Sequence, residues 1–81
     1  MNVDLTFGKY RIEQHENSNV LYMFDENSTS ESFIGIFQWV PKDNDVYITK
    51  MEVVKGSFQN LVYCLSLFVK KNDFSKVVFD L

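Results

Sequence analysis

The chain has 81 residues, a mass of 9.5 kDa and a formal net charge of -3. Hydrophobic residues make up 46% of it and aromatic residues 16%, which excludes wholesale disorder and predicts one small folded domain over residues 1–81. The only cysteine, Cys64, excludes an intramolecular disulfide framework and any multi-cysteine zinc site.

Alternating apolar and polar residues predict a first β-strand over residues 3–13. The alternation changes phase at Gly8, because Phe7 and Tyr10 are both apolar, and a glycine at such a point indicates a bulge or bend. The continuous apolar run over residues 20–24 predicts a second strand that is covered on both faces.

Two further strands are separated by residues typical of a turn. Residues 33–40 predict the third strand and residues 46–54 the fourth. The five-residue segment 41–45 begins with a proline, which ends the strand, and continues with Asp and Asn, which tolerate turn geometry. We therefore predict that strands two to four form an antiparallel meander.

Apolar residues recur at helical spacing from Phe58 to Val69, which predicts an amphipathic helix. Ser57 is a suitable N-cap, and Asn72 suits the left-handed position that ends a helix. Residues 76–81 predict a final strand, either antiparallel beside the first strand or parallel beside the fourth. The expected fold is α+β in the order ββββαβ: a four-stranded antiparallel meander, one helix packed on one face, and a fifth strand.

Pairing Val40 with Val46, and Phe24 with Phe33, assigns the two faces of the meander. One face carries no charge, so we predict that it packs under the helix; it collects Val20, Tyr22, Phe24, Phe33, Phe37, Trp39, Tyr47, Met51 and Val53. The other face carries a contiguous aliphatic group made of Leu21, Met23, Ile34, Ile36 and Ile48.

A helix is only about 10 Å wide and covers one face, so the aliphatic group is predicted to stay bare. A bare apolar patch on a small protein usually marks an interface with a partner or with a second copy. The alternative is that these residues are half covered by long neighbours such as Lys50, or by a misplaced strand.

Charge is distributed unevenly along the chain. Residues 13–45 hold seven acids and one base, whereas residues 46–81 hold three acids and five bases. The acids either decorate loops or form a surface that meets a basic partner, and the second interpretation adds four carboxylates to the partner-binding group: Glu26, Glu31, Asp43 and Asp45. Nucleic acid is not favoured as a direct ligand, because phosphate binding requires a basic stripe.

Residues that carry chemistry are few, and we predict no catalytic, metal or cofactor site among them. His15 lies between two glutamates in a turn, where an oriented catalytic partner is seldom available. Cys64 lies inside the uncharged helix segment without a basic group to lower its pKa. The segment 43–45 lacks the spaced oxygen ligands of a calcium loop.

Lys55, Gly56 and Ser57 precede the helix, whose N-terminal amides suit an anion. The order strand, glycine loop, helix and strand over residues 46–81 resembles the cofactor-binding half of acetyltransferases of the GNAT superfamily. That resemblance implies an anionic cofactor at this loop, although only Gly56 of the family's Gln/Arg-x-x-Gly-x-Gly/Ala segment is present.

The sequence as a whole favours a non-enzymatic protein-binding module. Residues 1–13 lack a basic stretch followed by an apolar run, and the longest apolar run, 58–69, is shorter than the roughly 20 residues of a membrane span. We therefore expect a cytoplasmic protein without membrane contact. Small acidic proteins of this kind often act as inhibitors or adaptors, including those encoded by phages and other mobile elements. The alternative function is a reduced acetyltransferase-like domain.

Overall fold

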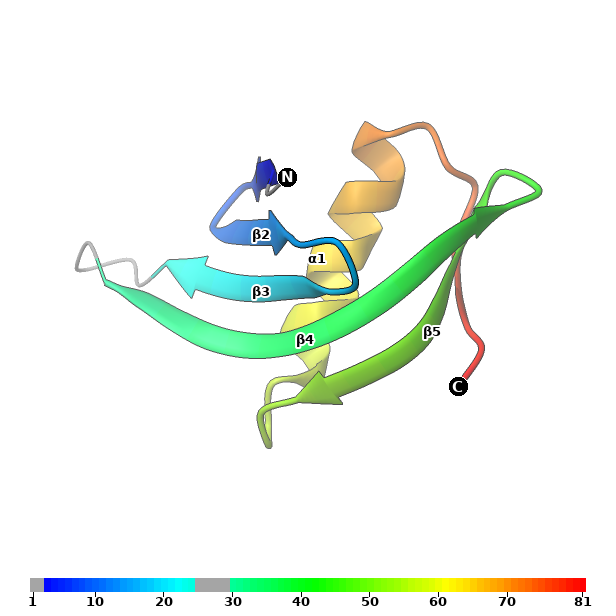
Figure 1. Ribbon diagram of the computed structural model, residues 1–81. Helices are drawn as coiled ribbons and strands as arrows, with labels where there is room; N and C mark the ends of the chain where they lie inside the picture. The colour runs from blue at the N-terminus through cyan, green and yellow to red at the C-terminus, as the bar shows by residue number, and fades with distance from the viewer. Residues whose placement is uncertain (1–2, 25–29) are drawn as a thin grey trace.

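The computed structural model describes residues 3–24 and 30–81, which contain six strands and one helix (Figure 1). The elements are β1 (Val3–Phe7), β2 (Tyr10–Gln14), β3 (Asn19–Phe24), β4 (Glu31–Lys42), β5 (Asp45–Val53), α1 (Phe58–Lys71) and β6 (Val77–Phe79). The strands form one sheet in sequential order, antiparallel from β1 to β5 and parallel between β5 and β6. The sheet curls, and α1 lies across one of its faces (Figure 1).

The predicted α+β class with one helix is confirmed, but the sheet has one strand more than predicted because the chain reverses at Gly8. Phe7 pairs with Tyr10, so Gly8 and Lys9 form a two-residue hairpin loop between β1 and β2. Gly8 has a φ of 60°, which glycine adopts without steric cost and which a tight hairpin turn requires at this position. The expected bulge or bend within one strand over residues 3–13 is thus a complete reversal between two strands.

The turn between β4 and β5 is also tighter than predicted. Lys42 pairs with Asp45, so Asp43 and Asn44 alone form the turn. Their φ angles of 53° and 67° are those of a type I′ hairpin, in which both central residues are left-handed. Val40 consequently faces Tyr47, one residue away from the predicted partner.

Two bulges shift the pairing further. In β4, Ile34 is an extra residue against the Leu21/Tyr22 step of β3. In β5, Thr49 is an extra residue against β4. Each extra residue interrupts the strict alternation of side chains between the two faces. The predicted faces are therefore exchanged along β3, at Phe33 and Ile34, and over residues 46–48. Phe37, Trp39, Met51 and Val53 lie on the core side as predicted.

On β3 and at the start of β4 and β5, the core side of the sheet carries residues that were predicted to be bare. Leu21 and Ile48 have no exposed surface, Ile34 is 2% exposed, and Met23 packs against the same core. The prediction that these four side chains form an exposed patch was wrong, and only Ile36 of that group is exposed. Conversely, part of the predicted core set faces away from the helix: Val20, Tyr22, Phe24, Phe33 and Tyr47.

The core lies between α1 and the sheet, and consists of Phe7, Tyr10, Ile12, Leu21, Ile34, Phe37, Val46, Ile48, Leu61, Cys64, Leu65, Phe68 and Val69. Phe68 makes edge-on ring contacts with Phe7 at 5.7 Å and with Trp39 at 5.2 Å. Gly35 permits the close approach of β4 to β5, since a Cβ there would lie 2.6 Å from the backbone oxygen of Glu52.

The helix begins after Ser57, as predicted, but the Ser57 side chain makes no capping hydrogen bond. At the other end the left-handed residue is Asp73, with a φ of 60°, and not the predicted Asn72. The Phe74 amide donates to the Val69 carbonyl at 3.0 Å, which is the long bond of a Schellman motif. The chain then returns as β6, parallel to β5, which was one of the two predicted positions of the last strand.

Alanine substitutions at two adjacent residues of β3 test the exchanged faces. Leu21→Ala removes a fully buried side chain and should lower the free energy of unfolding by about 2–5 kcal/mol. Val20→Ala changes the half-buried neighbour on the opposite face and should cost about 1 kcal/mol or less. Urea denaturation measures both, and a larger loss for Val20→Ala would show that the face assignment is incorrect.

Candidate functional site

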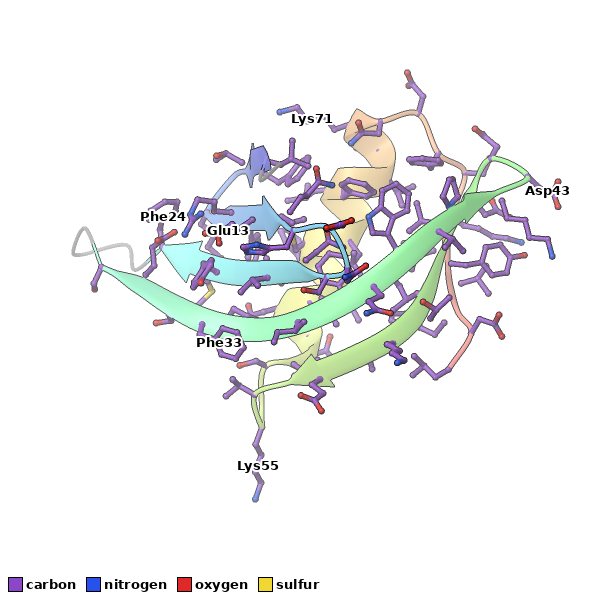
Figure 2. The ribbon with its side chains drawn as sticks, viewed as in Figure 1. Glu13, Phe24, Phe33, Asp43, Lys55 and Lys71 are labelled. Atoms are coloured by element: carbon purple, nitrogen blue, oxygen red, sulfur yellow. The ribbon has the colours of Figure 1, made fainter. Side chains whose placement is uncertain are left out.

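The face of the sheet opposite α1 carries several exposed apolar side chains. We call it the open face; it comprises Arg11, Glu13, Val20, Tyr22, Phe24, Phe33, Ile36, Gln38, Val40, Tyr47, Lys50 and Glu52. Three of these apolar side chains, Phe33, Ile36 and Val40, are 46%, 37% and 47% exposed. Figure 2 views the sheet from this side, with α1 behind it.

The strand register brings the apolar residues together. Tyr22 lies opposite Phe33, with their rings edge-on at 6.2 Å, and Val20 lies opposite Ile36. Phe24 and Phe33 lie toward one end of the sheet, whereas Asp43 lies at the tip of the β4–β5 hairpin at the other end (Figure 2). The open face therefore has an apolar centre that extends along β3 and β4 and consists of Val20, Tyr22, Phe33 and Ile36.

An ion-pair network borders this apolar centre on β2. Arg11 holds Glu31 with two hydrogen bonds of 2.7 and 3.0 Å and donates to Glu13 at 3.2 Å. The guanidinium carbon lies 4.5 Å from the centre of the Tyr22 ring, and Glu13 also contacts the His15 imidazole at 2.6 Å. The bidentate hydrogen bonding to Glu31 fixes the orientation of the Arg11 side chain on the open face.

The same contacts shift the pKa values of the two carboxyls. Hydrogen bonding to Arg11 lowers the pKa of Glu13 and that of Glu31, and the bond to His15 lowers the pKa of Glu13 further. Both carboxylates therefore stay ionised at neutral pH, and with one guanidinium between them they leave this border net negative. The sequence analysis did not single out Arg11 and assigned Tyr22 to the core face, because β2 was not treated as a strand of its own.

The predicted acidic residues take up different positions. Glu31 belongs to the network on β2 and β4, Asp43 is exposed in the hairpin turn, and Asp45 begins β5. Glu26 lies outside the described residues. The structure thus brings Glu31 close to the apolar centre but places Asp43 and Asp45 at the far end of the sheet.

A polar hollow of about 480 Å³ adjoins the open face between the β2–β3 turn and the middle of β4. Its lining residues are Gln14, His15, Glu16, Asn17, Ser18, Asn19, Gln38, Trp39, Val40 and Thr49. The Gln38 side-chain amide donates to the Asn17 carbonyl at 2.6 Å and ties the turn to β4. This hollow gives the open face a polar recess beside the exposed Val40.

The loop predicted to bind an anion is a short exposed turn. Gly56 has a φ of 84° and no atom within 4 Å of the position that a Cβ would take. The Ser57 amide, one of the amides near the helix start, already donates to the Val54 carbonyl at 2.9 Å. Lys55 is exposed and directed away from the sheet (Figure 2). These three residues lie apart from the apolar centre of the open face.

The two residues best suited to nucleophilic chemistry, His15 and Cys64, lie in different environments. His15 is partly exposed beside Glu13, whereas Cys64 is fully buried in the core. Burial raises the pKa of the Cys64 thiol to about 12. Within residues 3–24 and 30–81, no three His, Cys, Asp or Glu side chains are grouped so that they could hold a metal ion.

Comparisons with known proteins identify no relative of this chain. No protein-family model, curated protein or solved structure matches the chain. In the part of the chain that the structure describes, no helix is long and apolar enough to cross a membrane.

Replacing Arg11 by methionine tests the ion-pair network. In Arg11→Met the pKa values of Glu13 and Glu31 should rise toward the ordinary 4.5, as measured by NMR titration of the side-chain carboxyls. Because a lowered pKa stabilises the fold above the unfolded-state value, wild type should lose this stabilisation as the pH falls through the lowered pKa values. Lys9→Met, a neighbouring cation outside the network, should leave both titrations unchanged; identical titrations in Arg11→Met and wild type would contradict the network.

The Cys64 thiol should be inert in the folded protein. A buried thiol with a raised pKa offers little thiolate to a disulfide reagent at about pH 8. The native chain should therefore react slowly, and the same chain in concentrated urea should react completely within the mixing time. Fast stoichiometric labelling of the native chain would show that Cys64 is accessible.

Proposed function

We propose that this chain is a small non-enzymatic protein-binding module, an inhibitor or an adaptor, that docks its open face on a protein partner. The observation that carries the proposal is the exposure of Phe33, Ile36 and Val40 on a face that no element covers in the described part of the chain. Exposed apolar residues gathered on one face of a small domain are typical of an interaction surface.

The charges around the open face support a partner of defined chemistry. Glu13 and Glu31 share the single cation Arg11, and further carboxylates stand at Glu16 and Glu52. On the β2 side of the apolar centre acids thus outnumber bases, whereas on the β5 side Lys50 stands beside Glu52 and the Lys42 ammonium lies over the Tyr47 ring. The acidic β2 side favours a partner whose apolar patch carries Lys or Arg at the matching position. The aromatic pair Tyr22 and Phe33 would supply the large, stiff contact area that binding surfaces commonly use.

The alternative, an anionic cofactor at Lys55, Gly56 and Ser57, has less support. The parallel arrangement of β5, α1 and β6 is shared by many unrelated folds. Beyond the helix start itself, the described residues offer no second feature at this loop that points to a ligand.

Site-specific photocrosslinking tests the open face. A photoreactive phenylalanine analogue placed at Phe33 should crosslink a partner protein in extracts of the cells that produce the chain. The same analogue at Tyr63, which is 57% exposed on α1, should give no such product. Excess unlabelled wild-type chain should suppress the crosslink.

The variant Ile36→Glu, used as the unlabelled competitor in the crosslinking experiment, separates specific docking from nonspecific adsorption. It puts a charge at the apolar centre and should compete at least about tenfold more weakly than wild type, which corresponds to about 1.4 kcal/mol. Circular dichroism confirms that this variant is folded. The proposal fails if Ile36→Glu competes as well as wild type, or if the analogue at Tyr63 crosslinks the same protein equally.

A further inference from the structure

The second half of β5 is an open sheet edge. β6 pairs only with Val46, Tyr47 and Ile48, and the last bond on this side runs from the Asp80 amide to the Ile48 carbonyl at 2.9 Å. From Thr49 to Val53, no strand of the described chain pairs with β5 on the side away from β4. In Figure 1 the C-terminal segment accompanies only the first part of β5.

The backbone groups along this edge point outward at Met51 and Val53. The Val54 amide donates to the Ile34 carbonyl of β4 at 2.9 Å. Hydrogen-bonded and non-hydrogen-bonded pairs alternate along an antiparallel ladder, so Glu52 also directs its backbone groups to β4. Met51 and Val53 therefore each present one N–H and one C=O to the free side.

Exposed apolar side chains concentrate around this edge. Nine large apolar side chains are exposed in the described part of the chain, and five of them lie near this edge. Val54 directly follows β5, Ile36 and Leu81 share a hollow with Met51 and Glu52, and Phe79, which pairs with Ile48, contacts Phe58. A hollow of about 450 Å³ lies on one side, between Leu81 and the Ile36, Met51 and Glu52 positions. On the other side the rings of Phe58 and Phe79 lie 5.9 Å apart.

We propose that a second copy of this chain pairs with the β5 edge, antiparallel and centred on Met51, to form a twofold-symmetric dimer with one continuous sheet. In this register Met51 faces its own copy, and their outward N–H and C=O groups form two hydrogen bonds. Lys50 then lies opposite Glu52 of the second copy, and Glu52 lies opposite its Lys50, so the edge is complementary to itself in charge.

Other registers fit less well. Centring on Lys50 or on Glu52 would put identical charges directly opposite each other and would bring together backbone groups that already bind β4. Centring on Val53 would use outward backbone groups but would pair Glu52 with Val54, without an opposite charge. Within the described chain neither Lys50 nor Glu52 forms an ion pair, so both are available to a second copy.

The Met51 register also uses the stronger geometry for the charges. Lys50 and Glu52 would occupy a non-hydrogen-bonded pair, in which the facing Cα atoms lie only about 4.5 Å apart and side chains meet closely. The exposed Leu81 lines the hollow beside Met51. In the dimer it would shift away from the β5 edge and cover the interface between the two copies. This pairing does not depend on the open face binding another protein, and it would place two open faces side by side.

Charge reversal at the two exposed edge residues tests the pairing by solution mass. Light scattering after size-exclusion chromatography should give twice 9.5 kDa for wild type. Lys50→Glu alone and Glu52→Lys alone should each place like charges opposite each other, weaken dimerisation at least about tenfold, and elute as monomers at the same concentration. An equimolar mixture of the two variants restores both opposite-charge pairs and should form a heterodimer, detected by native mass spectrometry with one copy labelled with ¹⁵N.

Controls and a second readout keep the outcomes distinct. Lys70→Glu, at the exposed end of α1, should remain dimeric. The Met51 amide should exchange slowly with deuterium in wild type and quickly in either single variant, whereas a fold defect would also speed exchange in the core strands. A monomeric wild type, or a dimer that both single reversals leave unchanged, would overturn the proposal. Crosslinking through Phe33 reads out the open face separately, so each proposal can fail without the other.

Discussion

The rest of the structure depends on the packing of α1 against a single face of a six-stranded sheet. The helix supplies Leu61, Cys64, Leu65, Phe68 and Val69 to the core, and almost all other buried apolar residues come from the facing side of the strands. A single helix can cover only one face of the sheet. The face that α1 does not cover therefore becomes the surface of the protein. The choice of face therefore decides which residues hold the fold together and which can meet a partner.

That choice follows from β2 more than from the apolar runs of β3 and β4. Ile12 lies opposite Leu21, whereas Arg11 lies opposite Tyr22 and Glu13 opposite Val20. Charged side chains are seldom fully buried, so Arg11 and Glu13 stay on the outside and hold Tyr22 and Val20 there with them. A sequence analysis that separates β2 from β1 at Gly8 would have assigned Leu21 to the core.

The types of element were thus predictable, and their exact pairing was not. Helical spacing between Phe58 and Val69, and alternation elsewhere, identify the elements because those periods are local properties of the chain. The bulges at Ile34 and Thr49 are tertiary features, since an extra residue appears only when two strands are aligned. Each bulge reverses the assignment of the residues beyond it, which is why Ile36 kept its predicted exposure while Leu21, Ile34 and Ile48 did not.

The return of the chain after α1 explains why the open face adjoins an open edge. The helix leaves the end of β5 and delivers the chain to its beginning, so β6 must run parallel to β5 and starts beside Val46. Only three residues of β6 pair before the chain departs, and the later part of β5 stays without a neighbour on that side in the described structure. Edge strands of soluble proteins commonly carry a lysine that discourages further pairing. Here Lys50 is followed two positions later by Glu52 on the same face, so the feature that would repel a neutral or basic strand attracts a second copy of this one.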